Sequence, residues 1–462
     1  MFRILFIAFI VFFINLNLNV YAVNIVYPKS DNVKINSDKT FFIGNEDPAL
    51  NLKINNQPVK IHPSGGFKHT VYLNHGENKF VISNGKDQKV YKIYRPFITP
   101  NVQKDKRMIV YKTPIIVQTS QDSNPLRSTP VDSGLNRLQH LQKGINLSVI
   151  GEYGDFYKVK LDRDDIAWIN KNNVTKVDNN SLIYGIIAKN EYKNDKNSEI
   201  FTFKLNEKVP YVLNEEGLSG YTLTLYNMDS QLYPFGRYEF PIAHQGKNFG
   251  YTAYYNENNE LVVKISKYVN SLKGLRITLD AGHGESENGA IGCLGDKEKD
   301  INLQIAKILK KKLEKAGAVV FMTREDDKNL GLYERVDLSN KNNSQIFISI
   351  HNNALPDSMA DKDASGTEVY YFYPQSRYLA KVMALALSNE LGIKNRGAKG
   401  GSFAVIRNSE SLAILIEVAF MINPDENAKL RTVDFQNKVA QGVLKGLEKY
   451  FSGIDMEIVR NK

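Results

Sequence analysis

The sequence predicts a multidomain protein in which several β-rich modules precede one α/β domain. Its 462 residues exceed the roughly 100 to 200 residues of an ordinary domain. Up to about residue 270, short runs with β-type alternation are separated by turn residues. After Ser271, apolar strands alternate with amphipathic helices, a pattern that favours a largely parallel or mixed sheet flanked by helices.

The first 22 residues predict a cleaved export signal. Arg3 precedes an apolar run from Ile4 to Ile14, and Ala22 supplies a small residue at the expected cleavage point. The alternative, a membrane anchor, needs about 20 apolar residues, and Asn15 interrupts the run well before that length. We therefore expect an exported protein, in the periplasm, on the cell surface or outside the cell, with no integral membrane span after signal cleavage.

The net charge and the cysteine content limit which partners and which covalent links are expected. The net charge of +10 comes from lysines spread along the chain without a dense basic block, so a nucleic-acid partner is not expected. A polyanionic envelope surface fits this charge, and so does simple solubility. The single cysteine, Cys293, excludes an internal disulfide and a lipidated N-terminal cysteine.

Three β-rich segments are expected before the α/β domain. In residues 23–100 the strand Val90 to Tyr94 follows the hairpin pair Asn84-Gly85, which fits an immunoglobulin-like sandwich. In residues 106–178 the stretch GINLSVIGEYGDFYKVKLDRDDIAWI resembles bacterial SH3-like modules. Its aromatic residues, including Trp168, fit a barrel core better than a ligand groove. Residues 179–270 are β-rich and contain no recognisable motif.

Residues 274–452 form the expected α/β domain. The strand LRITLD leads to the helix EKDINLQIAKILKKKLEKAG, which Gly317 should end. Further apolar strands and helices alternate from AVVFM to VDFQNKVAQGVLKGLEKY.

Polar residues follow or end several of these apolar strands. His283 follows LRITLD, His351 follows IFISI, and Glu417 ends AILI inside an apolar string. Glu298 opens the first long helix. Ligands of open α/β sheets gather at the carboxyl ends of the strands, and a carboxylate among apolar residues is costly to bury without a function. Two histidines and a glutamate are the ligand types of a hydrolytic zinc site, and a further carboxylate suits a general base.

The motifs DAGHG, GAIG, EK, TRE, SIHNNA, GTEVYYF, NRGAK, FAVIRN and IEVAFMINPDE, in this order, resemble the zinc-dependent N-acetylmuramoyl-L-alanine amidases of the amidase_3 type. The resemblance covers residues 274–452. It implies that His283, Glu298 and His351 bind Zn²⁺ and that Glu417 is the catalytic base and acid. It also implies that Arg396 contacts substrate. No other cofactor is expected.

The chain departs from the family pattern at a few positions. Glu285 replaces the glycine usual after DAGHG, and Ala419 and Ile422 alter the last motif, but no ligand is lost. Cys293 in the same loop could react or bind metal, although a small residue that fills space is the simpler interpretation. The short segment ALPDSMADKDAS leaves no room for the inhibitory helix found in some members.

The resemblance implies a peptidoglycan hydrolase that cuts the amide between N-acetylmuramic acid and L-alanine. The modules before residue 270 would hold it at the wall or to an envelope activator protein. One alternative is a zinc amidase for another muropeptide bond. Another is a wall-binding scaffold that is catalytically silent or depends on an activator.

Overall fold

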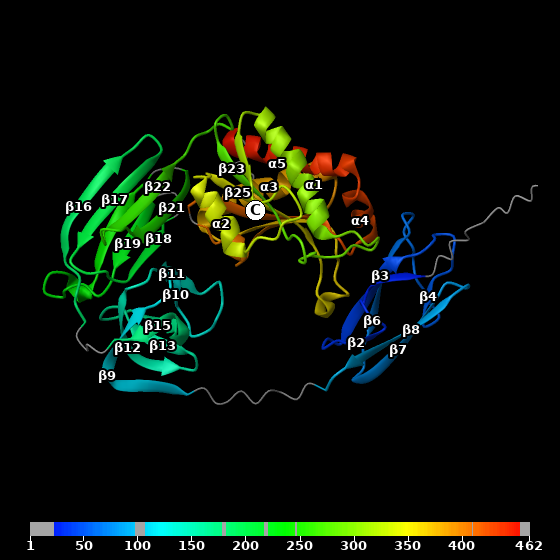
Figure 1. Cartoon of the computed structure of the whole chain (residues 1–462), viewed down its shortest axis with the longest axis horizontal. Helices are drawn as coiled ribbons and strands as arrows, with labels where there is room; N and C mark the ends of the chain where they lie inside the picture. Colours follow the sequence, from blue (N-terminus) through cyan, green and yellow to red (C-terminus); the bar gives the residue numbers. More distant parts are fainter. Residues whose placement is uncertain are drawn as a thin grey trace, which may run out of the picture.

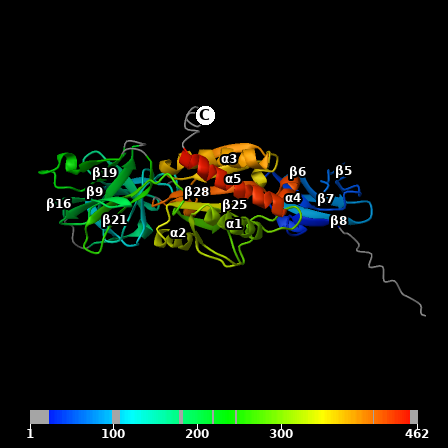
Figure 2. The same cartoon turned by 90° about the horizontal axis from the view of Figure 1, so that it is seen from above.

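The computed structural model describes residues 23–97, 107–177, 182–216, 220–244, 247–408 and 410–452. The predicted export signal, residues 1–22, lies outside the described residues. The α/β domain lies in the middle of the molecule, with an N-terminal β unit at one end and the remaining β-rich part at the other (Figure 1 and Figure 2). Among the described helices, none combines the length and apolar character needed to cross a membrane.

The N-terminal β unit, residues 23–97, consists of two sheets around one hydrophobic core. Phe42 and Phe67 of one sheet pack with Ile82 and Ile93 of the other, and all four are buried. The β-rich prediction is confirmed, whereas the immunoglobulin-like type stays a prediction. The first sheet has the order β1 (Asn24–Tyr27), β3 (Lys39–Asn45), β6 (Gly66–Tyr72), and the second β2 (Asn32–Lys34), β8 (Gln88–Arg95), β7 (Gly76–Ser83), β4 (Lys53–Ile54), β5 (Gln57–Pro58).

The next two β-rich segments share a single hydrophobic cluster. Val149 of the first segment belongs to the same buried set as Leu223 and Val263 of the second. Trp168 is buried, which supports its interpretation as a packing residue. The SH3-like type stays a prediction.

The described residues of this part form three sheets. They are β11 (Arg137–Leu141), β10 (Asn124–Arg127), β14 (Ile166–Asn170), β13 (Phe156–Lys160), β12 (Asn146–Tyr153), β9 (Met108–Thr119), β15 (Val174–Lys176); then β16 (Ile187–Asn194), β17 (Ser198–Leu205), β22 (Leu261–Lys267), β21 (Asn248–Tyr255); then β18 (Tyr211–Glu215), β19 (Gly220–Leu225), β20 (Tyr238–Ala243).

The α/β domain contains the predicted mixed sheet. Its pairs are parallel except for β26 against β28, which is antiparallel. The order is β24 (Val319–Met322), β23 (Arg276–Ala281), β25 (Ile346–Asn353), β28 (Leu412–Phe420), β26 (Thr367–Tyr371), β27 (Asn395–Gly400). The helices are α1 (Glu298–Lys315), α2 (Leu332–Lys341), α3 (Arg377–Leu391), α4 (Pro424–Leu430), α5 (Val433–Ser452).

Helices pack on one face of the sheet, and two of the predicted site residues lie on the other face. Helices α1, α3 and α5 pack on one face, where Ile350 and Ile416 join their core. Helix α1 buries Ile301 and Ile305 at helical spacing and is followed by Gly317 with φ +94°, as predicted. Successive side chains of a strand alternate between faces, so His351 and Glu417 point to the opposite face.

Candidate metal centre

His283, Glu298 and His351 converge although they lie far apart in the sequence. Each offers one ligand atom, and these atoms all lie within 4.8 Å of one another. His283 Nε2 lies 3.3 Å from Glu298 Oε2, and His351 Nδ1 lies 2.9 Å from Glu298 Oε1. Strands β23 and β25 are parallel neighbours, so their carboxyl ends bring the two histidines to the same edge of the sheet. The two imidazole rings are 4.8 Å apart and nearly perpendicular.

Glu298 is buried and held from several sides. Its Oε1 accepts a hydrogen bond from the backbone N–H of Asn352, and its Oε2 accepts one from Ala290. Burial alone would raise the pKa of Glu298, but its contacts with His283 and His351 hold that pKa below its usual range. The carboxylate is therefore charged and available as a ligand at neutral pH.

Two glycines make room for the ligand side chains. A Cβ at Gly282 would lie 2.2 Å from the His351 ring. A Cβ at Gly289, where φ is +67°, would lie 2.4 Å from Glu298 Oε2 and 2.7 Å from the His283 ring. The glycines of DAGHG and of the following loop thus allow the backbone to approach the ligands closely.

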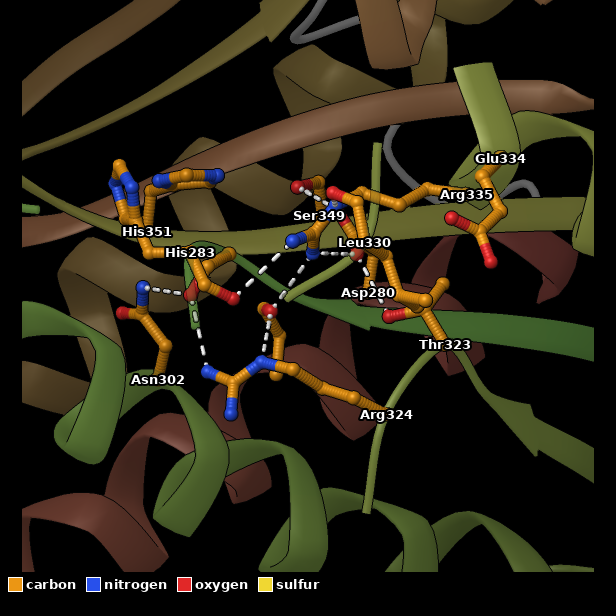
Figure 3. A network of polar contacts seen from close by, with 12 residues as sticks. Asp280, His283, Asn302, Thr323, Arg324, Leu330, Glu334, Arg335, Ser349 and His351 are labelled. Atoms are coloured by element: carbon orange, nitrogen blue, oxygen red, sulfur yellow. Dashed lines mark hydrogen bonds and ion pairs between the residues drawn. The ribbon is translucent and has the colours of Figure 1, made fainter. Parts of the chain in front are cut away.

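A buried polar network fixes the backbone that carries His283 (Figure 3). The carboxylate of Asp280 accepts hydrogen bonds of 2.7 Å each from Thr323, Arg335 and Ser349. Arg335 also donates to the backbone carbonyl of His283, at 3.1 Å. His283 has a φ of +65°, a strained conformation for a residue with a side chain, and these bonds stabilise it.

Arg324 completes this network from the other side. Its Nε donates to the carbonyl of Ala281 and its Nη2 to that of Gly282. Asp280, Arg324 and Arg335 were not singled out by the sequence reasoning. Two of them could have been noticed in the sequence, because they are charged residues within family motifs. Asp280 lies in DAGHG and Arg324 in TRE.

Glu417 lies across from His351 in the parallel pairing of β25 and β28. Its Oε2 is buried and has no hydrogen-bond partner among the described residues. Burial raises its pKa well above the usual range, and the nearby charges of Glu298 and Glu368 raise it further. An unpartnered buried carboxylate beside a ligand cluster is suited to exchange a proton with a bound substrate or water.

Arg396, on β27, is engaged with a neighbour of Glu417. Its Nε donates to Glu368 Oε2 at 2.7 Å, and its Nη1 donates to the carbonyl of Asp363. Glu368 pairs with Glu417 across β26 and β28 and is buried. The sequence reasoning missed Glu368, because a glutamate in an alternating strand indicates a solvent-facing position.

The other residues noted in this loop have ordinary surroundings. Cys293 is buried in an apolar cluster with Phe420 and Ile422 and is not part of the ligand group. Burial raises the pKa of its thiol to about 12, which fits a space-filling role. Glu285 is exposed, and its backbone N–H donates to Asp327.

The donor set fits a zinc ion. Two imidazoles and one carboxylate are a common ligand set of catalytic zinc, which leaves a further position for water or substrate. The cluster is buried on the side of Glu298, whereas His283 keeps 29% of its side chain exposed. A substrate can therefore reach the site from solvent.

Comparison with known proteins agrees with this chemistry. Residues 277–449 match the Amidase_3 family, described as N-acetylmuramoyl-L-alanine amidase. The probable cell wall amidase LytH of Staphylococcus epidermidis RP62A is 35% identical over 211 residues, which are 45% of this chain and 69% of LytH. The Staphylococcus aureus LytH is 34% identical over 205 residues, 44% and 67% of the two chains.

Solved structures of amidases are also similar to part of the chain. The catalytic domain of CwlV, an N-acetylmuramoyl-L-alanine amidase from Bacillus (Paenibacillus) polymyxa var. colistinus, is 36% identical with a TM-score of 0.36. The alignment covers 38% of this chain and 98% of the solved catalytic domain. An N-acetylmuramoyl-L-alanine amidase from Clostridium difficile 630 is 31% identical with a TM-score of 0.37, covering 39% and 98%.

Proposed function

The chain belongs to the Amidase_3 family of N-acetylmuramoyl-L-alanine amidases, and from this premise we propose that it is a zinc-dependent hydrolase of peptidoglycan. The bond cleaved is the amide between N-acetylmuramic acid and the L-alanine of the stem peptide. The single observation that carries the zinc part is the cluster of His283, Glu298 and His351, with ligand atoms within 4.8 Å, beside the unpartnered carboxylate of Glu417.

His283, Glu298 and His351 would hold the ion. When bound, zinc supplies Lewis acidity, which polarises the scissile carbonyl and makes a water molecule a stronger nucleophile. Arg335 and Arg324 hold the carbonyls around His283, and the backbone N–H groups of Ala290 and Asn352 orient Glu298. These contacts keep the three ligands in place before substrate arrives.

Glu417 performs the proton transfers. Its carboxylate accepts a proton from the attacking water and later donates that proton to the leaving nitrogen of L-alanine. Burial and the charges of Glu298 and Glu368 favour its protonated form, so the first transfer, in which the carboxylate accepts the proton, is made easier.

Arg396 lies near Glu417, because it binds Glu368, the cross-strand neighbour of Glu417. Its side chain is 22% exposed although its Nε is bound to Glu368, so a polar group of the substrate can reach the guanidinium. We retain Arg396 as a substrate-contacting residue in this proposal.

The β-rich part and the charge suggest where the enzyme acts. The predicted export signal over residues 1–22 and the net charge of +10 support action on a polyanionic wall outside the cytoplasmic membrane. We propose that the β-rich part contacts peptidoglycan or an envelope activator.

The test is a digestion of peptidoglycan by the purified chain from Val23 onward, with and without a zinc chelator. The Glu417→Ala variant is assayed in parallel, and products are identified by mass spectrometry. Free stem peptides that begin with L-alanine, lost on chelation and in the variant, are expected.

Two other results would redirect the assignment. Products cut at a different bond would mean a zinc amidase with another muropeptide specificity. A folded, zinc-loaded but inert chain would favour a scaffold or an enzyme that needs an activator, and addition of envelope extract would then separate these two.

A further inference from the structure

We propose that the N-terminal β unit, residues 23–97, acts as a brace for the amidase site. Its contacts hold in position the loops that carry the zinc ligands and the base. This inference rests on the proposed function. It differs from the role of a detached anchor, which the position of the unit at the start of the chain would suggest. The sheet that contains β3 and β6 faces the α/β domain near α4 (Figure 1).

Strand β3 has apolar side chains on both of its faces. Phe42 belongs to the core of the N-terminal β unit itself. Its neighbours Phe41 and Ile43 point the other way and are 5% and 2% exposed, because they pack with Phe420 and Ile422 of the α/β domain. A detached unit would expose both side chains to water, which is unfavourable. The sequence of β3 is therefore that of a strand covered on both sides.

Polar contacts surround this apolar junction and concentrate on residues 357–361. The carboxylate of Asp357 accepts hydrogen bonds from Tyr27 and Thr40, at 2.8 and 2.6 Å. The carbonyl of Ala360 accepts hydrogen bonds from Lys68 and Thr70, at 3.0 and 2.9 Å.

Charge complementarity adds to these bonds. Lys39 pairs with Asp361 at 3.0 Å, and their side chains are 17% and 32% exposed. Lys68 lies close enough to Asp361 and Asp363 for their charges to raise its pKa, although burial lowers it by more. The N-terminal β unit thus presents lysines to an acidic loop, and the loop's register against the unit is fixed by paired charges and hydrogen bonds.

The segments of the α/β domain that the N-terminal β unit contacts are adjacent in sequence to the predicted zinc ligands and the base. Cys293, whose carbonyl accepts a hydrogen bond from Asn45 at 3.1 Å, lies in the loop that leads to Glu298. Asp357 lies in the loop that follows His351, and Phe420 follows Glu417 on β28. One unit therefore contacts the chain next to two ligands and next to the base.

The contacts hold these loops without covering the metal centre. Within the described parts of the chain, no hydrogen bond or ion pair joins the N-terminal β unit to His283, Glu298, His351 or Glu417. His283 remains 29% exposed with the unit docked. The unit therefore supports the loops around the metal centre and does not block access to it.

The experiment separates docking from folding with two variants in the full chain from Val23 onward. Phe41→Asp places a charge in the apolar junction but leaves the unit's own core, which contains Phe42, intact. Lys39→Glu/Lys68→Glu reverses the lysines that face the acidic loop. Tyr94→Asp, at an exposed position of the other sheet, is the matched control. Small-angle X-ray scattering reports docking, and circular dichroism reports folding.

Two functional readouts follow, the rate of zinc loss to a chelating dye and the kinetics on a soluble muropeptide. We expect the two interface variants to undock, to lose zinc about tenfold faster and to show a lower kcat with little change in KM. The Tyr94→Asp variant should match the wild type.

Undocked variants that keep zinc and turn over at the wild-type rate would overturn the proposal and leave the unit as a tether. Variants that both stay compact would also overturn it, since the junction would not depend on these contacts. A wild-type chain without hydrolytic activity would contradict the proposed function alone. The rates of zinc loss from the wild type and the interface variants would then still test whether docking of the unit stabilises the metal centre.

Discussion

Glu368 lies directly opposite Glu417 where β26 pairs antiparallel with β28. Cross-strand partners share a face, so the two carboxylates are on the same side of the sheet. Glu368 is paired with Arg396 and Lys399, whereas Oε2 of Glu417 has no partner among the described residues. The carboxylate of Glu368 therefore holds the two cations beside the site in place. The carboxylate of Glu417 is available to accept and donate a proton.

The first prediction concerns Glu368. Burial alone would raise its pKa, but Lys399, Arg396 and Tyr370 hold that pKa below its usual value. Glu368→Gln would leave the two cations without their anion. We expect the free energy of unfolding to fall by about 2 kcal/mol, measured by urea titration. The exposed Glu285→Gln serves as control, and equal stability of the two variants would contradict the role of Glu368.

The second prediction is that Glu417→Gln loses activity and gains stability. The amide cannot take the proton of the attacking water, so kcat should fall by about a thousandfold. Replacement of a carboxyl group whose buried Oε2 has no hydrogen-bond partner among the described residues should raise the free energy of unfolding of the zinc-free chain by about 1 kcal/mol. Muropeptide kinetics and urea unfolding in chelator measure the two effects. A destabilised variant would argue that Glu417 has a structural partner.

The third prediction concerns Gly282. A methyl group there would lie 2.2 Å from the His351 ring and displace it. We expect Gly282→Ala to weaken zinc binding by about 10-fold to 100-fold, measured by chelator competition. Gly400→Ala is the matched control, because a Cβ at Gly400 meets no atom within 4 Å. Wild-type zinc affinity in Gly282→Ala would mean that the ring has room to move.

The fourth prediction is a pH-dependent contribution of Asp280 to stability. Burial alone would raise its pKa, but Arg335, Ser349 and Thr323 lower it below the ordinary 3.8. A depressed folded-state pKa stabilises the protein above pH 3.8, and this stabilisation is lost as the pH falls through the folded value. At neutral pH, Asp280→Asn should lower the free energy of unfolding by about 3 kcal/mol.

The difference between wild type and Asp280→Asn should narrow below pH 3.8, as measured by urea unfolding from pH 6 down to pH 2.5. A difference that stays constant with pH would show that the charge of Asp280 does not contribute. Glu285→Gln, at an exposed position, is the control substitution.

Much of the α/β domain could be predicted because its signals are local. The apolar spacing in α1 and the glycine after it are properties of neighbouring residues, and the structure confirms them. Strand β27 and helix α4 were not predicted. Strand β27 reads NRGAKG, has no apolar alternation and forms only as an edge strand beside β26. Its existence depends on a partner far away in the sequence.

Residue types and short-range periodicity predicted the alternation of elements, and the family motifs implied the roles of His283, Glu298, His351 and Glu417. Only the folded chain shows which strands are neighbours, that Glu368 is buried opposite Glu417, and that Phe41 of the N-terminal β unit packs on the α/β domain. The physical reason is that burial and charge pairing depend on contacts between distant segments, and the free energy of those contacts is set only when the whole chain has packed.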